Sequence, residues 1–259
     1  MKDLLPSLLA ILTSFAPLSA AIVEKPLEYK SGGVLCEGWQ AYDDAVTGPR
    51  PGVLVVHQWT GISDHEKAAA RKLAALGYNV LVADIYGKGV RPQPPAAGKE
   101  AGKYKGNRLL LRSRVNAALG VLSRDARTDA SKLAATGYCF GGTTVLELAR
   151  SGAALKGVVS FHGGLDSPTP GDGKNIKAQV LALHGADDPF VPAKDVAAFE
   201  AEMKAAGVDY KLVKYPGAVH SFTHKEAGSD NAKGAAYNAD ADRDSWLQLE
   251  QFLKTTLGR

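Results

Sequence analysis

Gly137-Tyr138-Cys139-Phe140-Gly141 is the most informative segment of this 259-residue chain. An apolar run at residues 133–136 leads into it, and a helical pattern that starts at Thr144 follows it. A nucleophile between two small residues, placed between a strand and a helix, is the sequence form of a nucleophile elbow. Its glycines permit a turn so tight that the central side chain stands exposed at the start of the helix. Cys139 is therefore predicted to be an exposed nucleophile, at a position where serine is more usual.

Short apolar runs alternate with helical patterns on both sides of this segment. Strands that are apolar throughout and separated by helices predict a single α/β domain with a mostly parallel central sheet and helices on both faces. The carboxyl ends of parallel strands lie at one edge of the sheet, where ligands bind. The expected strands are residues 53–56, 80–83, 133–136, 158–161, 180–183 and 210–213, with another early strand at 34–38. The expected helices are residues 67–76, 109–122, 196–206 and 242–257, with a further helix after Cys139.

Composition excludes several classes of protein. The chain is 45% hydrophobic and 22% charged, which is ordinary for one large globular domain. Its net charge of +4 is mild, and no Lys/Arg run is dense enough to indicate a nucleic-acid partner. No cluster with metal-ligand spacing and no phosphate-binding loop occurs, so neither a metal nor a cofactor is expected. We expect a monomer.

Residues 1–21 differ from the rest of the chain and are predicted to be a secretory signal peptide. Lys2 is followed by an apolar stretch at 4–18 and by small residues at 19–21, which resemble a cleavage site. The stretch is too short and too often interrupted to span a membrane. The predicted domain is therefore 22–259, in a secreted or periplasmic protein that leaves the membrane when the signal is removed. The alternative is an apolar N-terminal helix packed on the domain.

Two later loops supply the partners that a nucleophile needs. A base must take its proton, and a carboxylate must orient that base. Asp188 follows the expected strand at 180–183, and His220 follows the strand at 210–213, in the order nucleophile, acid, histidine. The spacing to Val191-Pro192 favours Asp188 over Asp187 as the acid. His220 is favoured over the other candidate histidines, which are His57, His162, His184 and His224.

These motifs resemble the dienelactone hydrolases of the α/β-hydrolase superfamily. The residues that carry the resemblance are residues 137–142, 188–192 and 220–222, together with 57–61 and 84–87. The resemblance implies an α/β-hydrolase fold and hydrolysis of small-molecule esters or lactones without a cofactor. It implies an acyl-cysteine intermediate formed by a triad of Cys139, Asp188 and His220. It also implies an oxyanion hole from the backbone N–H groups of Phe140 and Trp59.

The chain departs from the family pattern at three positions. Gln58 stands where the family typically carries a glutamate, and glutamine cannot act as a base. His220 alone is then expected to activate Cys139. Lys88 and His224 stand at the apparent positions of two arginines that bind a substrate carboxylate, which weakens the preference for an anionic substrate. Gln58, Lys88, Ser221 and His224 are candidates for residues that contact or flank the substrate.

Other interpretations stay open from the sequence. The protein could be a thioesterase, or a binding protein that kept the fold and lost turnover. A redox protein would use Cys36 and Cys139, although no Cys-x-x-Cys motif is present. Residues 87–107 hold three prolines and five basic residues, and such a long connection is either a lid over the site or a surface excursion.

Overall fold

A computed structural model describes residues 21–258 of the chain. Most of the predicted signal peptide, residues 1–20, lies outside the described residues. The described part forms one eight-stranded sheet with the order β1-β2-β4-β3-β5-β6-β7-β8. The strands are β1 (Ile22–Ser31), β2 (Val34–Asp43), β3 (Arg50–Val56), β4 (Asn79–Ala83), β5 (Thr128–Tyr138), β6 (Gly157–Phe161), β7 (Gln179–Gly185) and β8 (Tyr210–Tyr215).

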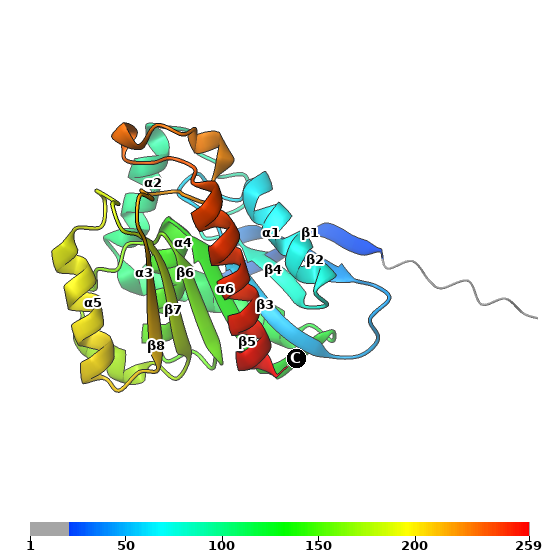
Figure 1. The fold of residues 1–259 in the computed structure, drawn as a ribbon. Coiled ribbons are helices and arrows are strands. Elements are labelled where there is room, and N and C mark those ends of the chain that lie inside the picture. Colours follow the sequence, from blue (N-terminus) through cyan, green and yellow to red (C-terminus); the bar gives the residue numbers. More distant parts are fainter. Residues whose placement is uncertain (1–20, 259) are drawn as a thin grey trace, which may run out of the picture.

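Six helices cover the two faces of this sheet (Figure 1). Strands β3 to β8 run parallel, whereas β1 and β2 pair antiparallel with their neighbours. This arrangement confirms the predicted α/β-hydrolase fold with a mostly parallel sheet. The helices are α1 (Asp64–Ala75), α2 (Ala96–Lys105), α3 (Arg108–Arg124), α4 (Phe140–Arg150), α5 (Ala193–Ala205) and α6 (Ala239–Leu257).

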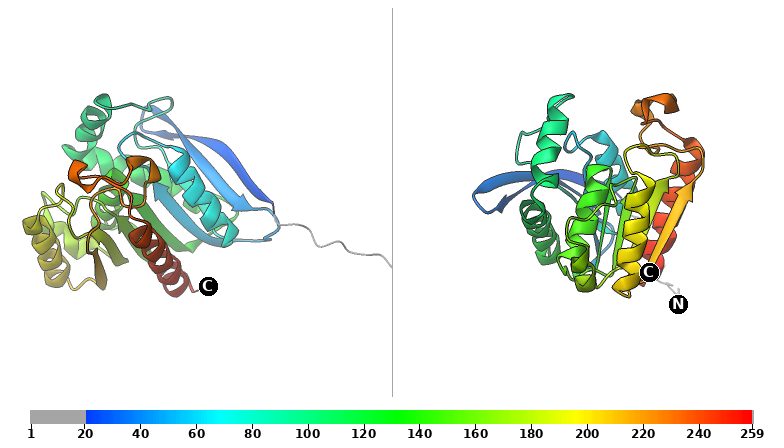
Figure 2. Two further views of the ribbon diagram at one scale, coloured as in Figure 1. Left: turned by 45° about the horizontal axis from the view of Figure 1, so that its top comes forward. Right: turned by 90° about the vertical axis from the view of Figure 1, so that its left-hand side faces the viewer.

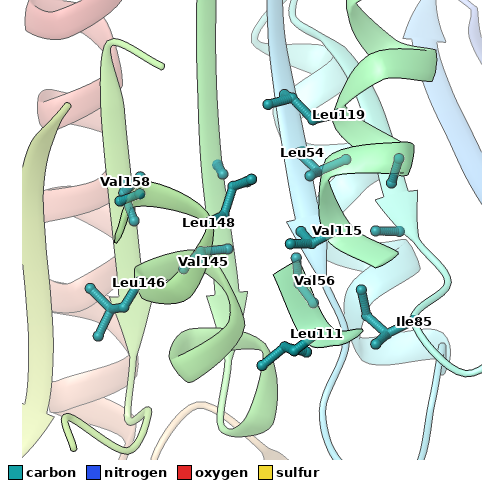
Figure 3. Close-up of a cluster of buried hydrophobic side chains, with 14 of the residues drawn as sticks. Leu54, Val56, Ile85, Leu111, Val115, Leu119, Val145, Leu146, Leu148 and Val158 are labelled. Atoms are coloured by element: carbon teal, nitrogen blue, oxygen red, sulfur yellow. The ribbon is translucent and has the colours of Figure 1, made fainter. Parts of the chain in front are cut away.

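The strands of the parallel sheet contribute side chains to two separate hydrophobic cores, because successive side chains point to opposite faces of the sheet. On β3, Leu54 and Val56 belong to the core under α2, α3, α4 and α5. Val53 and Val55, one position along, belong to the core under α1 and α6. Figure 3 shows the first core, where side chains of α3 and α4 pack against the sheet. A sheet buried on both faces explains why its strands are apolar throughout.

The carboxyl ends of the parallel strands form the edge that carries the site. Reactive or polar residues stand one to five positions after the ends of these strands, whereas the strand interiors are mostly apolar. These residues are His57 after β3, Asp84 after β4, Cys139 after β5, His162 after β6, Asp188 after β7 and His220 beyond β8. Parallel strands therefore bring together groups that are separated by up to 163 positions in the sequence.

Two elements were not predicted. Strand β1 pairs along its whole length with β2, and its mixture of polar and half-buried residues gave no clear pattern. Helix α2 lies within residues 87–107, directly after a proline-rich stretch that suggested an irregular connection. It has three buried residues, Ala97, Ala101 and Tyr104, which are too few to give a strong helical signal. In the right-hand view of Figure 2, α2 and residues 225–237 rise on opposite sides of the sheet edge.

Candidate active site

Cys139 occupies a strained turn between β5 and α4. Its backbone angles are φ 55° and ψ −114°, a conformation that costs a non-glycine residue about 1–3 kcal/mol. Two glycines make the turn possible by close approach. A Cβ on Gly137 would lie 2.3 Å from the carbonyl oxygen of Gly141, and one on Gly141 would lie 2.2 Å from that of Val56. The predicted elbow is therefore present, with the thiol at the positive end of α4.

Three side chains from three loops meet at this turn. His220 Nε2 lies 3.0 Å from Cys139 Sγ, and His220 Nδ1 lies 2.7 Å from Asp188 Oδ2. The Asp188 carboxylate is buried and also accepts the N–H of Phe190 through Oδ1 at 2.8 Å. Asp187 instead accepts the backbone N–H of Gly217, as expected for a turn residue. The structure thus brings together the three residues selected from the sequence.

The electrostatics of this trio favour an ion pair. Burial raises the pKa of the Cys139 thiol, but the His220 imidazole and the N–H of Phe140 outweigh it and leave the pKa below its ordinary value. Burial lowers the pKa of His220, but the Cys139 sulfur and the Asp188 carboxylate outweigh it and raise the pKa to about 10. The two shifts have opposite directions. Each group thus favours the charged form of the other, and the thiolate–imidazolium pair is stabilised relative to two isolated groups.

The two residues named as backbone N–H donors, Phe140 and Trp59, both line the pocket around the sulfur. Phe140 opens α4, and its N–H interacts with the thiolate. Trp59 lies in the turn after β3 and lines the same pocket as Cys139. Among residues 21–258, nothing accepts a hydrogen bond from the Trp59 N–H. Both donors named from the sequence are thus residues of this pocket.

The remaining candidates lie at different distances from the reaction centre. Ser221 lines the pocket and has a positive φ of 57°, which places the backbone after His220 in a left-handed turn. Gln58 is buried, and its amide lies 3.4 Å from His224 Nδ1 rather than against the thiol. His224 also packs edge-on against His65 and lies 3.4 Å from Glu226. Gln58 and His224 therefore contact each other, and neither is among the residues that line the pocket around Cys139.

Lys88 does not join the site. Its ammonium group forms ion pairs with Glu28 and with Glu37, the latter at 3.4 Å. These two carboxylates are neighbours because Glu28 of β1 pairs directly with Glu37 of β2. The pairing of β1 with β2 was not predicted from the sequence. It places Lys88 against two carboxylates, and Lys88 is not among the residues that line the pocket around Cys139.

A cavity of about 400 Å³ lies above Cys139. Most of its wall is apolar or aromatic, including Phe190, whose side chain is 62% exposed and packs edge-on against His220. Lys105 of α2 lines the same cavity, and no described carboxylate lies within salt-bridge distance of its ammonium group. The sequence analysis missed Lys105 and Phe190. Lys99 and Lys103 lie on the same helix as Lys105, and the sequence does not show which of the three lysines reaches the pocket.

A second histidine lies close to the elbow. His162 Nδ1 accepts the backbone N–H of Cys139 at 3.2 Å, and Nε2–H donates to Thr223 Oγ1 at 2.8 Å. Burial holds the pKa of His162 well below its ordinary value, so the ring stays neutral. It therefore supports the backbone of the elbow.

Cys36, the other cysteine, is buried in β2, and both cysteines are free thiols. Within residues 21–258, no three His, Cys, Asp or Glu side chains are grouped so that they could hold a metal ion. None of the helices in that same part of the chain is long and apolar enough to cross a bilayer.

Comparison with known proteins agrees with this geometry. Residues 37–257 match the model of the dienelactone hydrolase family. The chain belongs to the dienelactone hydrolase family. It is thus an ester or lactone hydrolase of the α/β-hydrolase superfamily.

Three relatives cover between 68% and 92% of the chain. The crystal structure of the dienelactone hydrolase-like promiscuous phosphotriesterase P91 from metagenomic libraries is 38% identical, covers 92% of this chain and 99% of its own, and superposes with a TM-score of 0.87. A putative carboxymethylenebutenolidase of Methylorubrum extorquens is 28% identical over 80% of this chain and 72% of its own length. A probable 2-oxo-3-(5-oxofuran-2-ylidene)propanoate lactonase of Bradyrhizobium is 32% identical over 68% of this chain and 75% of its own.

Proposed function

We propose that the chain hydrolyses carboxylic esters or lactones through an acyl-cysteine intermediate, with Cys139 as nucleophile. The observation that carries this proposal is the 3.0 Å contact between His220 Nε2 and Cys139 Sγ, backed by the 2.7 Å contact between His220 and Asp188. A nucleophile, a base and an orienting carboxylate in hydrogen-bonding sequence are the requirements of covalent acyl transfer.

The proposed reaction starts from the thiolate–imidazolium pair. The Cys139 thiolate attacks the substrate carbonyl carbon, and the oxygen becomes an oxyanion. The carbonyl re-forms as the C–O bond to the leaving alkoxide breaks, and His220 donates its proton to that alkoxide. His220, now neutral, then accepts a proton from water, whose oxygen attacks the thioester carbonyl. The thiolate leaves, the acid departs, and the ion pair is restored. Asp188 holds the ring with Nδ1–H directed toward its carboxylate throughout.

The developing oxyanion needs hydrogen-bond donors. We assign this role to the N–H groups of Phe140 and Trp59, which belong to residues on the pocket wall. Such donors are fixed by the backbone before the reaction, so they stabilise the transition state without reorganising. The loss of one typically slows turnover by about 10²- to 10³-fold.

The pocket wall indicates the kind of acyl group that is accepted. Trp59, Phe140 and Phe190 supply aromatic surface, and Val191 and two alanines add aliphatic surface. Lys105 is the one lysine or arginine among the residues that line the cavity. We propose a substrate with an apolar body and an electron-rich or anionic group that reaches Lys105. In this proposal the cation that binds the substrate is Lys105 of α2 and not Lys88.

We also propose that the protein is exported. The apolar stretch and small residues within 1–21 support this, and the first strand begins directly afterwards at Ile22. Expression in a Gram-negative host, fractionation and N-terminal sequencing provide the test. Export predicts a product in the periplasm that starts near Ile22, whereas an intact N-terminus in the cytoplasm contradicts it.

Hydrolysis of 4-nitrophenyl acetate and a panel of lactones by the wild type and by Cys139→Ala tests the proposed function. The proposal predicts turnover by the wild type and loss of that turnover in the variant, with unchanged thermal unfolding. Equal rates for the two proteins would refute the role of Cys139. Absence of hydrolysis by the wild type across the panel would instead favour a binding protein.

A further inference from the structure

His57 is a fully buried histidine beside the site, and the proposed reaction does not use it. It directly follows β3 and is 0% exposed. Its ring stacks on Phe140 at a centroid distance of 5.7 Å and meets Tyr86 edge-on at 4.7 Å. A polar ring is expensive to bury unless both nitrogens have partners. The identity of these partners indicates what the ring does.

The two hydrogen bonds of the ring fix one tautomer. The backbone N–H of Ile85 points at Nε2 from 3.2 Å, so Nε2 is the acceptor and carries no proton. Nδ1 lies 2.6 Å from the carbonyl oxygen of Gln58. In a neutral imidazole the proton is then on Nδ1, and it is donated to that carbonyl. Burial lowers the pKa of His57, which keeps the ring in this neutral form.

The carbonyl of Gln58 belongs to the same planar peptide as the N–H of Trp59. Because a peptide is rigid, a hydrogen bond that fixes its C=O also fixes the direction of its N–H. The Gln58 carbonyl points toward His57, and the Trp59 N–H, which points the opposite way within the same plane, is the proposed oxyanion donor. A donated hydrogen bond also polarises the peptide, which makes its N–H a stronger donor.

Neighbouring contacts hold the rest of this turn. The Gln58 N–H donates to Glu66 Oε1 at 3.2 Å, and the Tyr86 hydroxyl donates to the Trp59 carbonyl at 2.9 Å. Gly61 N–H also reaches the Gln58 carbonyl, at 3.2 Å. His57 supplies the shorter of the two bonds to that carbonyl, and it is the one bond from a side chain.

We propose that His57 is a positioning residue for the oxyanion hole, because its Nδ1–H holds the Gln58–Trp59 peptide with the Trp59 N–H directed at the substrate oxygen. His57 does not touch the reacting atoms. This inference rests on the proposed function, since it requires an acyl-cysteine whose oxygen is bound by the Trp59 N–H.

Two substitutions isolate the bond to Gln58. In both His57→Phe and His57→Asn the Ile85 N–H loses its acceptor, but the amide of asparagine can occupy the place of Nδ1–H and phenylalanine cannot. We expect kcat of His57→Phe to fall roughly 10- to 100-fold with KM changed by less than about threefold, and His57→Asn to recover much of the loss. Equal kcat in the two variants would overturn the inference.

A spectroscopic readout separates this role from a merely structural one. The carbonyl stretching frequency of a cinnamoyl–Cys139 thioester reports the strength of the hydrogen bonds to the acyl oxygen. We expect it to shift upward in His57→Phe relative to the wild type and to lie between them in His57→Asn. The rate of Cys139 alkylation should be unchanged, because the thiolate does not depend on the Trp59 donor. An unshifted carbonyl, or alkylation lost in parallel with kcat, would refute the role.

A further test uses the wild type alone and does not depend on whether a variant folds. The ¹⁵N chemical shifts of His57 should show a protonated Nδ1 and an unprotonated Nε2. The opposite tautomer would overturn the inference, because Nδ1 could not then donate to Gln58. Failure of the wild type to form any cinnamoyl-cysteine would reject the proposed function itself, which makes the two failures distinguishable.

Discussion

The elbow and the pocket wall are built in opposite ways. Around Cys139, glycines in backbone contact, a strained turn and three strand ends fix every reactive group. Part of the pocket wall away from the elbow is formed by α2, a helix without a side-chain N-cap that buries three residues, and by the exposed ring of Phe190. Reaction chemistry thus rests on rigid backbone, whereas substrate selection rests on side chains that project from less constrained elements. Changes at the elbow should abolish turnover for all substrates, and changes in the wall should alter which substrates are preferred.

The largest effect on turnover is expected from a substitution of Asp188, the carboxylate that orients His220. Asp188→Asn keeps the shape of the side chain but removes the charge that stabilises the His220 imidazolium. We expect kcat to fall by roughly 10³- to 10⁴-fold for every ester tested. Steady-state assays on several substrates measure this. The matched control is Asp187→Asn, whose amide oxygen can still accept the N–H of Gly217 and which should keep most of its activity.

A matched pair of glycine substitutions compares the two regions in stability. Gly141→Ala places a Cβ 2.2 Å from a backbone oxygen of β3, so we expect the free energy of unfolding to fall by more than about 3 kcal/mol. Gly102→Ala in α2 meets no atom within 4 Å, and we expect a gain of about 0.5–1 kcal/mol. Urea denaturation measures both. A mild effect at Gly141 would contradict the rigid elbow.

The third prediction concerns pH. Thiolate exists above the lowered pKa of Cys139, and imidazolium persists until the pH passes the raised pKa of His220, about 10. The reactive pair therefore spans the interval between these values. The acid limb of Cys139 alkylation by iodoacetamide should therefore lie below the ordinary thiol pKa of about 8.5.

Cys36 provides the internal control for this experiment, because burial raises its pKa to about 11. In Cys139→Ala, the residual alkylation should be slow and should rise only at high pH. A profile of Cys139 that rises only above about 8.5 would show that no ion pair forms.

The smallest effect is expected at the wall. Lys105→Met removes the cation from the pocket, and we expect kcat/KM for 4-nitrophenyl hemisuccinate to fall by about 5- to 10-fold relative to 4-nitrophenyl butyrate. Lys103→Met on the same helix, whose partner is Glu100, is the matched control and should leave this ratio unchanged. An unchanged ratio in Lys105→Met would contradict the proposal that the substrate carries an anionic group that reaches Lys105.

The sequence allowed the elbow side to be predicted because its signals are local. Cys139, Asp188 and His220 each follow an apolar strand, and the rule that parallel strands end at one edge places them together. The wall could not be predicted in this way. Lys105 reaches the pocket only because α2 packs by two alanines and a tyrosine, and Lys88 is withdrawn because β1 and β2 pair Glu28 with Glu37. Both outcomes depend on tertiary contacts that no single segment encodes.

The central claim is a covalent bond between Cys139 and the acyl group of the substrate. Rapid acid quenching of the wild type during turnover of 4-nitrophenyl butyrate, followed by peptide mass spectrometry, tests it most directly. The account predicts a butyryl group on the peptide that contains Cys139 and none on Cys36. Undiminished turnover with no acylated Cys139 peptide would contradict it.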